Sequence, residues 1–189
     1  YDFEGIQLVL PTTVFEDRHV LNLDGTEVHL IYVGPCHQTG DTLIHVPSEG
    51  VVFTGDVIFH ECTPMGWNGS YEKWMKNLDF IISLKPKVIV PGHGPVCGVE
   101  GVVQMKAYLE YVRGEAMRCF GLGMSALDAS KKIDFGPYAE WRAPARIFMN
   151  VERAYREFRN EAGDAPWDHA KTFDAIYHVA KARGLHLEF

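Results

Sequence analysis

Three short apolar runs, each leading into a glycine-containing turn with a metal-ligand side chain, constrain this chain more than any other feature. The side chains that follow the three runs are, in order, His37, Asp56 and His93. Each apolar run is typical of a buried strand, and the glycines let the backbone turn sharply or approach a neighbour closely. The pattern predicts three strand ends that present two imidazoles and a carboxylate, ligand types that zinc and related divalent metals prefer.

The surrounding sequence predicts a sheet. Asp24-Gly25 is a hairpin turn signal, and a second hairpin is predicted across the Pro-Ser-Glu-Gly turn before Val51. The apolar stretch that ends at Pro11 predicts an edge or entry strand. The predicted strands are those at 6–10, 19–23, 27–33, 42–46, 51–53 and 88–90.

Helical spacing appears between the last two strands. Ser70 is a predicted N-cap, and Trp74, Leu78 and Ile81 recur at i, i+4 and i+7, which predicts an amphipathic helix that Pro86 ends. Beyond residue 101 the apolar residues keep helical spacing, and the helices are predicted at about 102–120, 126–133, 147–158 and 173–180. We therefore predict two parts, a sheet unit covered by helices at 1–100 and a mostly helical extension at 101–189, packed on it.

The residues of the three motifs and the order of the motifs are specific. G-P-x-H-x-x-G-D, F-T-G-D and P-G-H-G-P, spread between about Leu8 and Pro95, resemble the second half of the metallo-β-lactamase superfamily. The resemblance implies an α+β fold, namely half of a four-layer αβ/βα sandwich with a helical C-terminal extension. The H-x-H-x-D-H motif of the family's first half is absent from this chain, because no other histidine has that spacing.

The resemblance also implies ligand roles. The residue at His37 binds one metal, the residue at His93 binds the other, and Asp56 bridges both; Asp41 matches a position that supports the site through hydrogen bonds. Two zinc ions are implied in the complete fold, with iron or manganese as alternatives. Because this chain supplies only two ligands to each metal, we expect weak metal binding, or none, by this chain alone.

The implied function is a metal-dependent hydrolase. Metal-bound hydroxide would attack an ester, thioester, lactam or phosphoester, once the missing N-terminal half is supplied. The sequence P-G-H-G-P differs from the P-G-H-E-Y type of sequence found in glyoxalase II enzymes. This difference disfavours the substrate of those enzymes. The alternatives are a non-catalytic half-domain that acts as a dimerising interaction module, a metal-binding pseudoenzyme, and an oxidoreductase of the flavodiiron kind.

Further side chains are candidates for the substrate cleft, namely His60, Trp67 and Tyr71. The alternative for His60 is an exposed loop position, and the alternative for the two aromatic residues is packing against the sheet. Arg142 and Arg146 in the helical extension are candidates for binding a substrate anion. Surface pairing with Glu140 or Glu152 is the favoured interpretation of both arginines.

Net charge, apolar runs and cysteine spacing disfavour several functions. A net charge of −7 disfavours nonspecific nucleic-acid binding, and the chain lacks an apolar run of about 18 residues, which disfavours a membrane span. No leader is visible at Tyr1, so a cytoplasmic location is expected. The cysteines form no C-x-x-C pair, which predicts free thiols, with an oxidation-sensitive thiol or adventitious metal ligand as the alternative; they are Cys36, Cys62, Cys97 and Cys119.

Half of a sandwich would leave one sheet face bare. The candidates for this face are Leu30, Tyr32, Leu43 and Val52. A bare apolar sheet face exceeds the few hundred Å² that a soluble monomer normally exposes. We therefore predict a partner, either the missing N-terminal half or a second copy in a homodimer, together with a small-molecule substrate.

Overall fold

A five-stranded sheet, whose strands lie side by side in the order of the sequence, forms the N-terminal part of the chain. The computed structural model describes residues 3–161 and 165–187. The strands are β1 (Arg18–Leu23), β2 (Thr26–Tyr32), β3 (Thr42–Val46), β4 (Val51–Phe59) and β5 (Val88–His93). Neighbouring strands pair antiparallel up to β4, whereas β4 and β5 pair parallel. The parallel pair needs a crossover, which helix α1 (Tyr71–Ser83) provides.

The two predicted hairpins are confirmed. Asp24 and Gly25 both have positive φ, 50° and 88°, as a tight two-residue hairpin turn requires, and Val46 pairs with Val51 across the second turn. The strand predicted at 6–10 is wrong. Ile6 and Leu10 are each 70% exposed, and the stretch pairs with no strand among the described residues. Apolar character favours a strand only where a neighbouring strand can complete the hydrogen-bond ladder.

The predicted helices are confirmed with small shifts at their ends. Ser70 caps α1, because its side chain accepts a hydrogen bond from the Lys73 amide at 3.1 Å, and Ser125 caps the third helix in the same way. The remaining helices are α2 (Val99–Gly121), α3 (Ala126–Lys132), α4 (Ile147–Phe158) and α5 (His169–Arg183), with 3-10 turns at Gly136–Tyr138 and Pro144–Arg146. Among the described residues, no helix is both long and apolar enough to cross a membrane.

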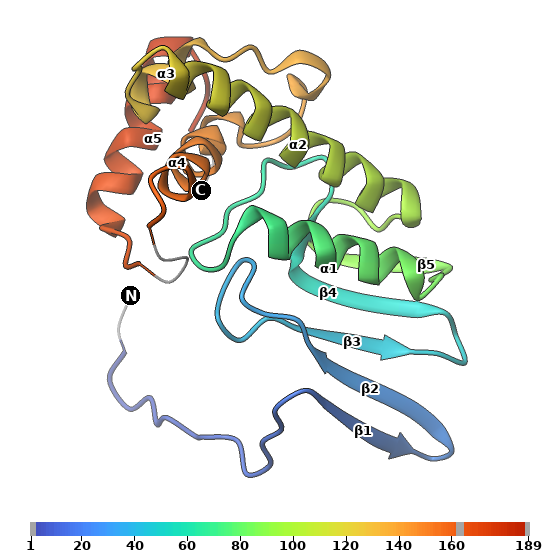
Figure 1. Cartoon of the computed structure of the whole chain (residues 1–189). Coiled ribbons are helices and arrows are strands. Elements are labelled where there is room, and N and C mark those ends of the chain that lie inside the picture. Colours follow the sequence, from blue (N-terminus) through green and yellow to red (C-terminus); the bar gives the residue numbers. More distant parts are fainter. Residues whose placement is uncertain (1–2, 162–164, 188–189) are drawn as a thin grey trace.

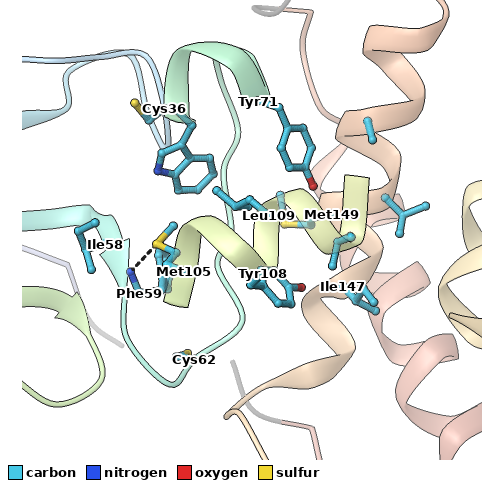
Figure 2. Close-up of a cluster of buried hydrophobic side chains, with 14 of the residues drawn as sticks. Cys36, Ile58, Phe59, Cys62, Tyr71, Met105, Tyr108, Leu109, Ile147 and Met149 are labelled. Atoms are coloured by element: carbon cyan, nitrogen blue, oxygen red, sulfur yellow. Dashed lines mark hydrogen bonds between the residues drawn. The ribbon is translucent and has the colours of Figure 1, made fainter. Parts of the chain in front are cut away.

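The core lies between the sheet and the helices, which gather on one side of it (Figure 1). Trp74, Leu78 and Ile81 of α1 are completely buried, as their spacing predicts. Figure 2 shows how β4, α1, α2 and α4 meet at this core, where the Phe59 amide donates to Met105 Sδ at 3.3 Å. One cluster of buried apolar side chains includes residues of both the sheet unit and the helical extension, so the two parts share one core. Burying each large apolar side chain contributes about 1.5–3 kcal/mol to stability.

The opposite face of the sheet is bare and apolar. Side chains alternate between the two faces along a strand, and the register aligns Leu30, Ile44 and Phe53 on the bare face. Leu43 and Val52, which were candidates for this face, are completely buried under the helices instead. We call the bare surface the open face; its exposed large side chains are Leu21, Leu23, Tyr32, Ile44, Phe53 and Val88.

Candidate functional site

Strand direction brings the three sequence motifs to one edge of the sheet. β2 and β4 both pair antiparallel with β3, so they run the same way, and β5 runs parallel to β4. The C-terminal ends of all three strands therefore lie at the same edge. His37 follows β2, Asp56 lies in the irregular second half of β4, and His93 ends β5.

Asp56 lies between the two histidines. Its Oδ2 is 3.3 Å from His37 Nε2, and its Oδ1 is 3.5 Å from His93 Nε2. Each carboxylate oxygen thus faces a different imidazole. The exposed fraction of the side chain is 16% for His37, 34% for Asp56 and 46% for His93, so the group is open to solvent on the His93 side.

The orientation of His37 calls for a cation beside Asp56. Its Nδ1 lies 2.7 Å from the Met65 carbonyl oxygen, and because a carbonyl only accepts, Nδ1 carries the proton. In a neutral ring Nε2 then presents a lone pair, and it faces a carboxylate oxygen, which is also an acceptor. Two acceptors that face each other need a proton or a metal ion between them, so this donor set fits a divalent cation.

Asp41 holds the loop that carries His37. Its Oδ2 accepts hydrogen bonds from the amides of Cys36 at 2.8 Å and His37 at 2.7 Å. The Gln38 amide donates to the same carboxylate at 3.1 Å. Three amides directed at one carboxylate restrict the loop, so Asp41 sets the position of the His37 backbone.

The glycines on either side of His93 allow its loop to approach the site. A Cβ on Gly92 would lie 2.0 Å from Asp56 Oδ1. Gly94 has φ +89°, and a Cβ there would lie 1.7 Å from the His60 carbonyl oxygen. These glycines are therefore required by close approach, and at Gly94 also by backbone conformation.

A cavity of about 200 Å³ opens beside the two histidines. Its lining residues are His37, Phe59, Met65, His93, Arg146, Phe173 and Ile176. The Phe59 ring stacks on the His93 ring with centroids 4.9 Å apart. α5 contributes two of the apolar walls, so the helical extension closes this cavity. The sequence offered no signal for these walls, because ordinary core spacing explains the same apolar residues.

The other cleft candidates do not line this cavity. His60 places Nδ1 3.0 Å from the Pro95 carbonyl oxygen, and Tyr71 is buried, with its hydroxyl donating to the Asn150 carbonyl at 2.9 Å. Trp67 stacks on the ring of His169, with centroids 4.4 Å apart. Among the described residues, none of the three candidates lines the cavity beside His37.

Arg153 of α4 braces the site loops, a role that the sequence did not reveal. Its Nη2 donates to the Cys36 carbonyl at 2.9 Å and to the Asn68 carbonyl, and the guanidinium lies over the Trp74 ring, 5.1 Å from its centroid. Burial lowers the pKa of Arg153 from its ordinary value. The loop of His37 and the loop after β4 are thus tied to one helix of the extension.

The favoured interpretation of Arg146 as a surface ion pair is wrong. Arg146 is only 7% exposed, and its Nη1 contacts Cys62 Sγ at 3.6 Å. Glu152, one of its two candidate partners, pairs instead with Arg156 and Arg159. Helix spacing alone could not reveal that the residue before α4 faces inward.

None of the four cysteines forms a disulfide, as predicted, and all four are buried. Burial raises the pKa of Cys36 to about 11 and that of Cys97 to about 11. Metal binding and oxidation both require the thiolate, which these surroundings disfavour. The alternative of a reactive thiol beside the site therefore loses support.

The ligand count of the described chain is incomplete. Within residues 3–161 and 165–187, no group of three or more His, Cys, Asp or Glu side chains is arranged to hold one metal ion. His37 and His93 instead face different oxygens of Asp56. Such an arrangement offers one imidazole and one carboxylate oxygen to each of two ions, and a catalytic metal normally has three protein ligands.

Known proteins resemble part of this chain. A family model described as "Metallo-beta-lactamase superfamily" matches residues 3–93. The 2,4-dinitroanisole O-demethylase subunit alpha of Nocardioides sp. (strain JS1661) is 31% identical over 91 residues, which are 46% of this chain and 27% of that protein. The metallo-beta-lactamase type 2 of Bacteroides fragilis is 29% identical over 104 residues, 52% of this chain and 42% of that protein. The chain thus spans less than half the length of these relatives.

Two solved structures share the fold at low sequence identity. The inverting sec-alkylsulfatase Pisa1 from Pseudomonas sp. has a TM-score of 0.61 and 16% identity, covering 80% of this chain and 27% of that chain. A metallo-beta-lactamase family protein from Thermus thermophilus has a TM-score of 0.56 and 18% identity, covering 82% of this chain and 50% of that chain. Both alignments extend beyond residue 93, so the similarity in fold includes part of the helical extension.

Proposed function

Given that this chain belongs to the metallo-β-lactamase superfamily through residues 3–93, we propose that it supplies one half of the dinuclear metal site of a hydrolase. The observation that carries the proposal is the position of Asp56, whose two oxygens face the Nε2 atoms of His37 and His93. A carboxylate can bridge two cations through its two oxygens, whereas an imidazole nitrogen binds one.

We propose zinc for both positions, with iron or manganese as alternatives, because imidazole and carboxylate suit all three. When bound, such metals make water a nucleophile near neutral pH and polarise a carbonyl or phosphoryl oxygen. His37, Asp56 and His93 hold the ions, and the Met65 carbonyl keeps His37 Nε2 directed at the site. Phe59, which stacks on His93, forms an apolar wall of the cavity beside the site.

The substrate class is an ester, thioester, lactam or phosphoester, each of which has an oxygen that a cation can polarise. We also place the protein in the cytoplasm, since its cysteines are free thiols, as is usual in a reducing compartment.

The test of this function is metal content, measured by elemental analysis on protein purified from its native source, with an intact mass from the same sample. We expect a mass above 21.3 kDa, about two metals per chain and hydrolysis of 4-nitrophenyl acetate that EDTA abolishes. A mass near 21.3 kDa without metal or hydrolysis would overturn the proposal and favour the non-catalytic interaction module.

The second part of the proposal is a partner that covers the open face. We propose that a half-domain carrying the H-x-H-x-D-H motif covers this face and adds the missing ligands. Two observations support it: the chain spans only 27% and 42% of the curated relatives, and Ile44 and Phe53 are 39% and 42% exposed at the centre of the sheet. Exposed apolar side chains grouped on one sheet face are typical of a protein interface.

Without its partner, the isolated chain is expected to self-associate through the open face. Phe53→Lys should reduce this association, because a charge in an apolar contact must be desolvated. Val103→Lys, at an exposed apolar position on α2, is the control. Sedimentation velocity measures both. A discrete dimer that only Phe53→Lys dissociates would assign the face to a second copy, and a monomeric native chain at every concentration would contradict the need for any partner.

A further inference from the structure

Within residues 3–161 and 165–187, Arg146 is a buried charge without a counter-charge. It ends the 3-10 turn Pro144–Arg146 and is 7% exposed. Its Nη1 contacts the Cys62 thiol at 3.6 Å, and its Nε has no hydrogen-bond partner among the described residues. No carboxylate of the described chain forms an ion pair with it.

An unpaired buried guanidinium is unfavourable, because a charge removed from water must be compensated by an opposite charge or by hydrogen bonds. Arg153, the other buried arginine of this region, donates from Nη2 to two backbone carbonyls, while its Nη1 has no partner among the described residues. Arg146 has only a thiol, which is a weak acceptor. An anionic group bound beside Arg146 would supply this compensation.

The space beside Arg146 is the cavity that also contacts His37 and His93. At about 200 Å³ it is smaller than the roughly 300 Å³ at which pockets begin to hold drug-sized ligands. Its remaining walls are apolar, formed by Phe59, Met65, Phe173 and Ile176. The cavity therefore suits a small molecule with an apolar body and one anionic group.

We propose that Arg146 determines the substrate specificity of the site by binding a carboxylate of a small, otherwise apolar substrate. The planar guanidinium pairs with a carboxylate through two parallel hydrogen bonds. The inference rests on the proposed hydrolase function, because it assigns the substrate of that same site. With the carboxylate at Arg146, the rest of the substrate reaches along the cavity to His37 and His93, where the metals bind.

The probes are phenylacetate and its neutral analogue phenylacetamide, with affinities measured by isothermal titration calorimetry on the full chain. EDTA is present throughout, so that a carboxylate cannot bind through a metal. We expect phenylacetate to bind at least about tenfold more tightly than phenylacetamide, and Arg146→Gln to remove this preference, since a hydrogen bond to a charged group is worth this much. Arg118→Gln, an exposed arginine paired with Glu115 on its own helix, should leave both affinities unchanged.

Equal affinity for the two probes, or no binding of phenylacetate, would overturn the subsite. If circular dichroism shows that Arg146→Gln does not fold, the native chain is crystallised with 4-bromophenylacetate instead. A carboxylate against Arg146 supports the inference, and a probe bound elsewhere refutes it. Because EDTA removes the metals from these measurements, failure of the subsite leaves the metal content and hydrolysis tests of the proposed function independent.

Discussion

Asp56→Asn should lower the Zn²⁺ affinity of the complete site by more than about 100-fold, since removing a group that merely orients a ligand already costs 10–100-fold. Asparagine keeps the shape of the side chain but loses its charge and one of the two oxygens that face His37 and His93. One metal position therefore loses its oxygen ligand, and the other keeps only a neutral amide oxygen in place of a carboxylate oxygen. Hydrolysis of 4-nitrophenyl acetate should disappear with the metal.

The measurement is a Zn²⁺ titration against a competing chelator, on the protein that carries both halves of the site. Asp79→Asn is the matched control, because Asp79 is an exposed acid on α1 that pairs with Lys106 and lies outside the cavity lining. Native Zn²⁺ affinity in Asp56→Asn, with folding unchanged by circular dichroism, would show that Asp56 does not bridge the metals.

Arg153→Met should destabilise the chain by about 3 kcal/mol, because it leaves the buried carbonyl of Cys36 and the part-buried carbonyl of Asn68 without this donor. The methionine fills part of the volume over Trp74 but cannot donate a hydrogen bond. For a chain of this size the loss corresponds to a melting temperature lower by roughly 6–12 °C. The loop of His37 should loosen as well, since Cys36 precedes it directly.

Thermal unfolding followed by circular dichroism measures the first effect, and amide hydrogen exchange at residues 36–38 measures the second. Arg159→Met provides the control, because the ion pairs of Arg159 among the described residues are surface pairs, with Glu152 and Glu161. It should change stability by less than about 0.5 kcal/mol. If Arg153→Met has the same melting temperature as the control Arg159→Met, α4 does not brace the site loops.

Sequence patterns predicted the local structure around the site well, for reasons that can be traced. The Asp24-Gly25 turn and the Ser70 cap depend on the conformations and hydrogen bonds of a few adjacent residues. Trp74 and Leu78 were assigned to the core because helical spacing places them on one face. The same reasoning was wrong for Ile6 and Leu10, because a strand depends on a neighbouring strand that local sequence does not contain.

By itself, then, the sequence determined the order of the hairpins and helices, the buried face of α1 and the three motifs that carry His37, Asp56 and His93. Only the tertiary structure decided that Asp56 lies between the two imidazoles, that Leu43 faces the helices while Ile44 faces outward, and that two arginines of the extension face inward: Arg146 to line the cavity and Arg153 to brace its loops. The physical reason is the range of the forces involved. Backbone conformation and periodicity are properties of neighbouring residues, whereas burial of a charge depends on segments that folding brings together from distant parts of the chain.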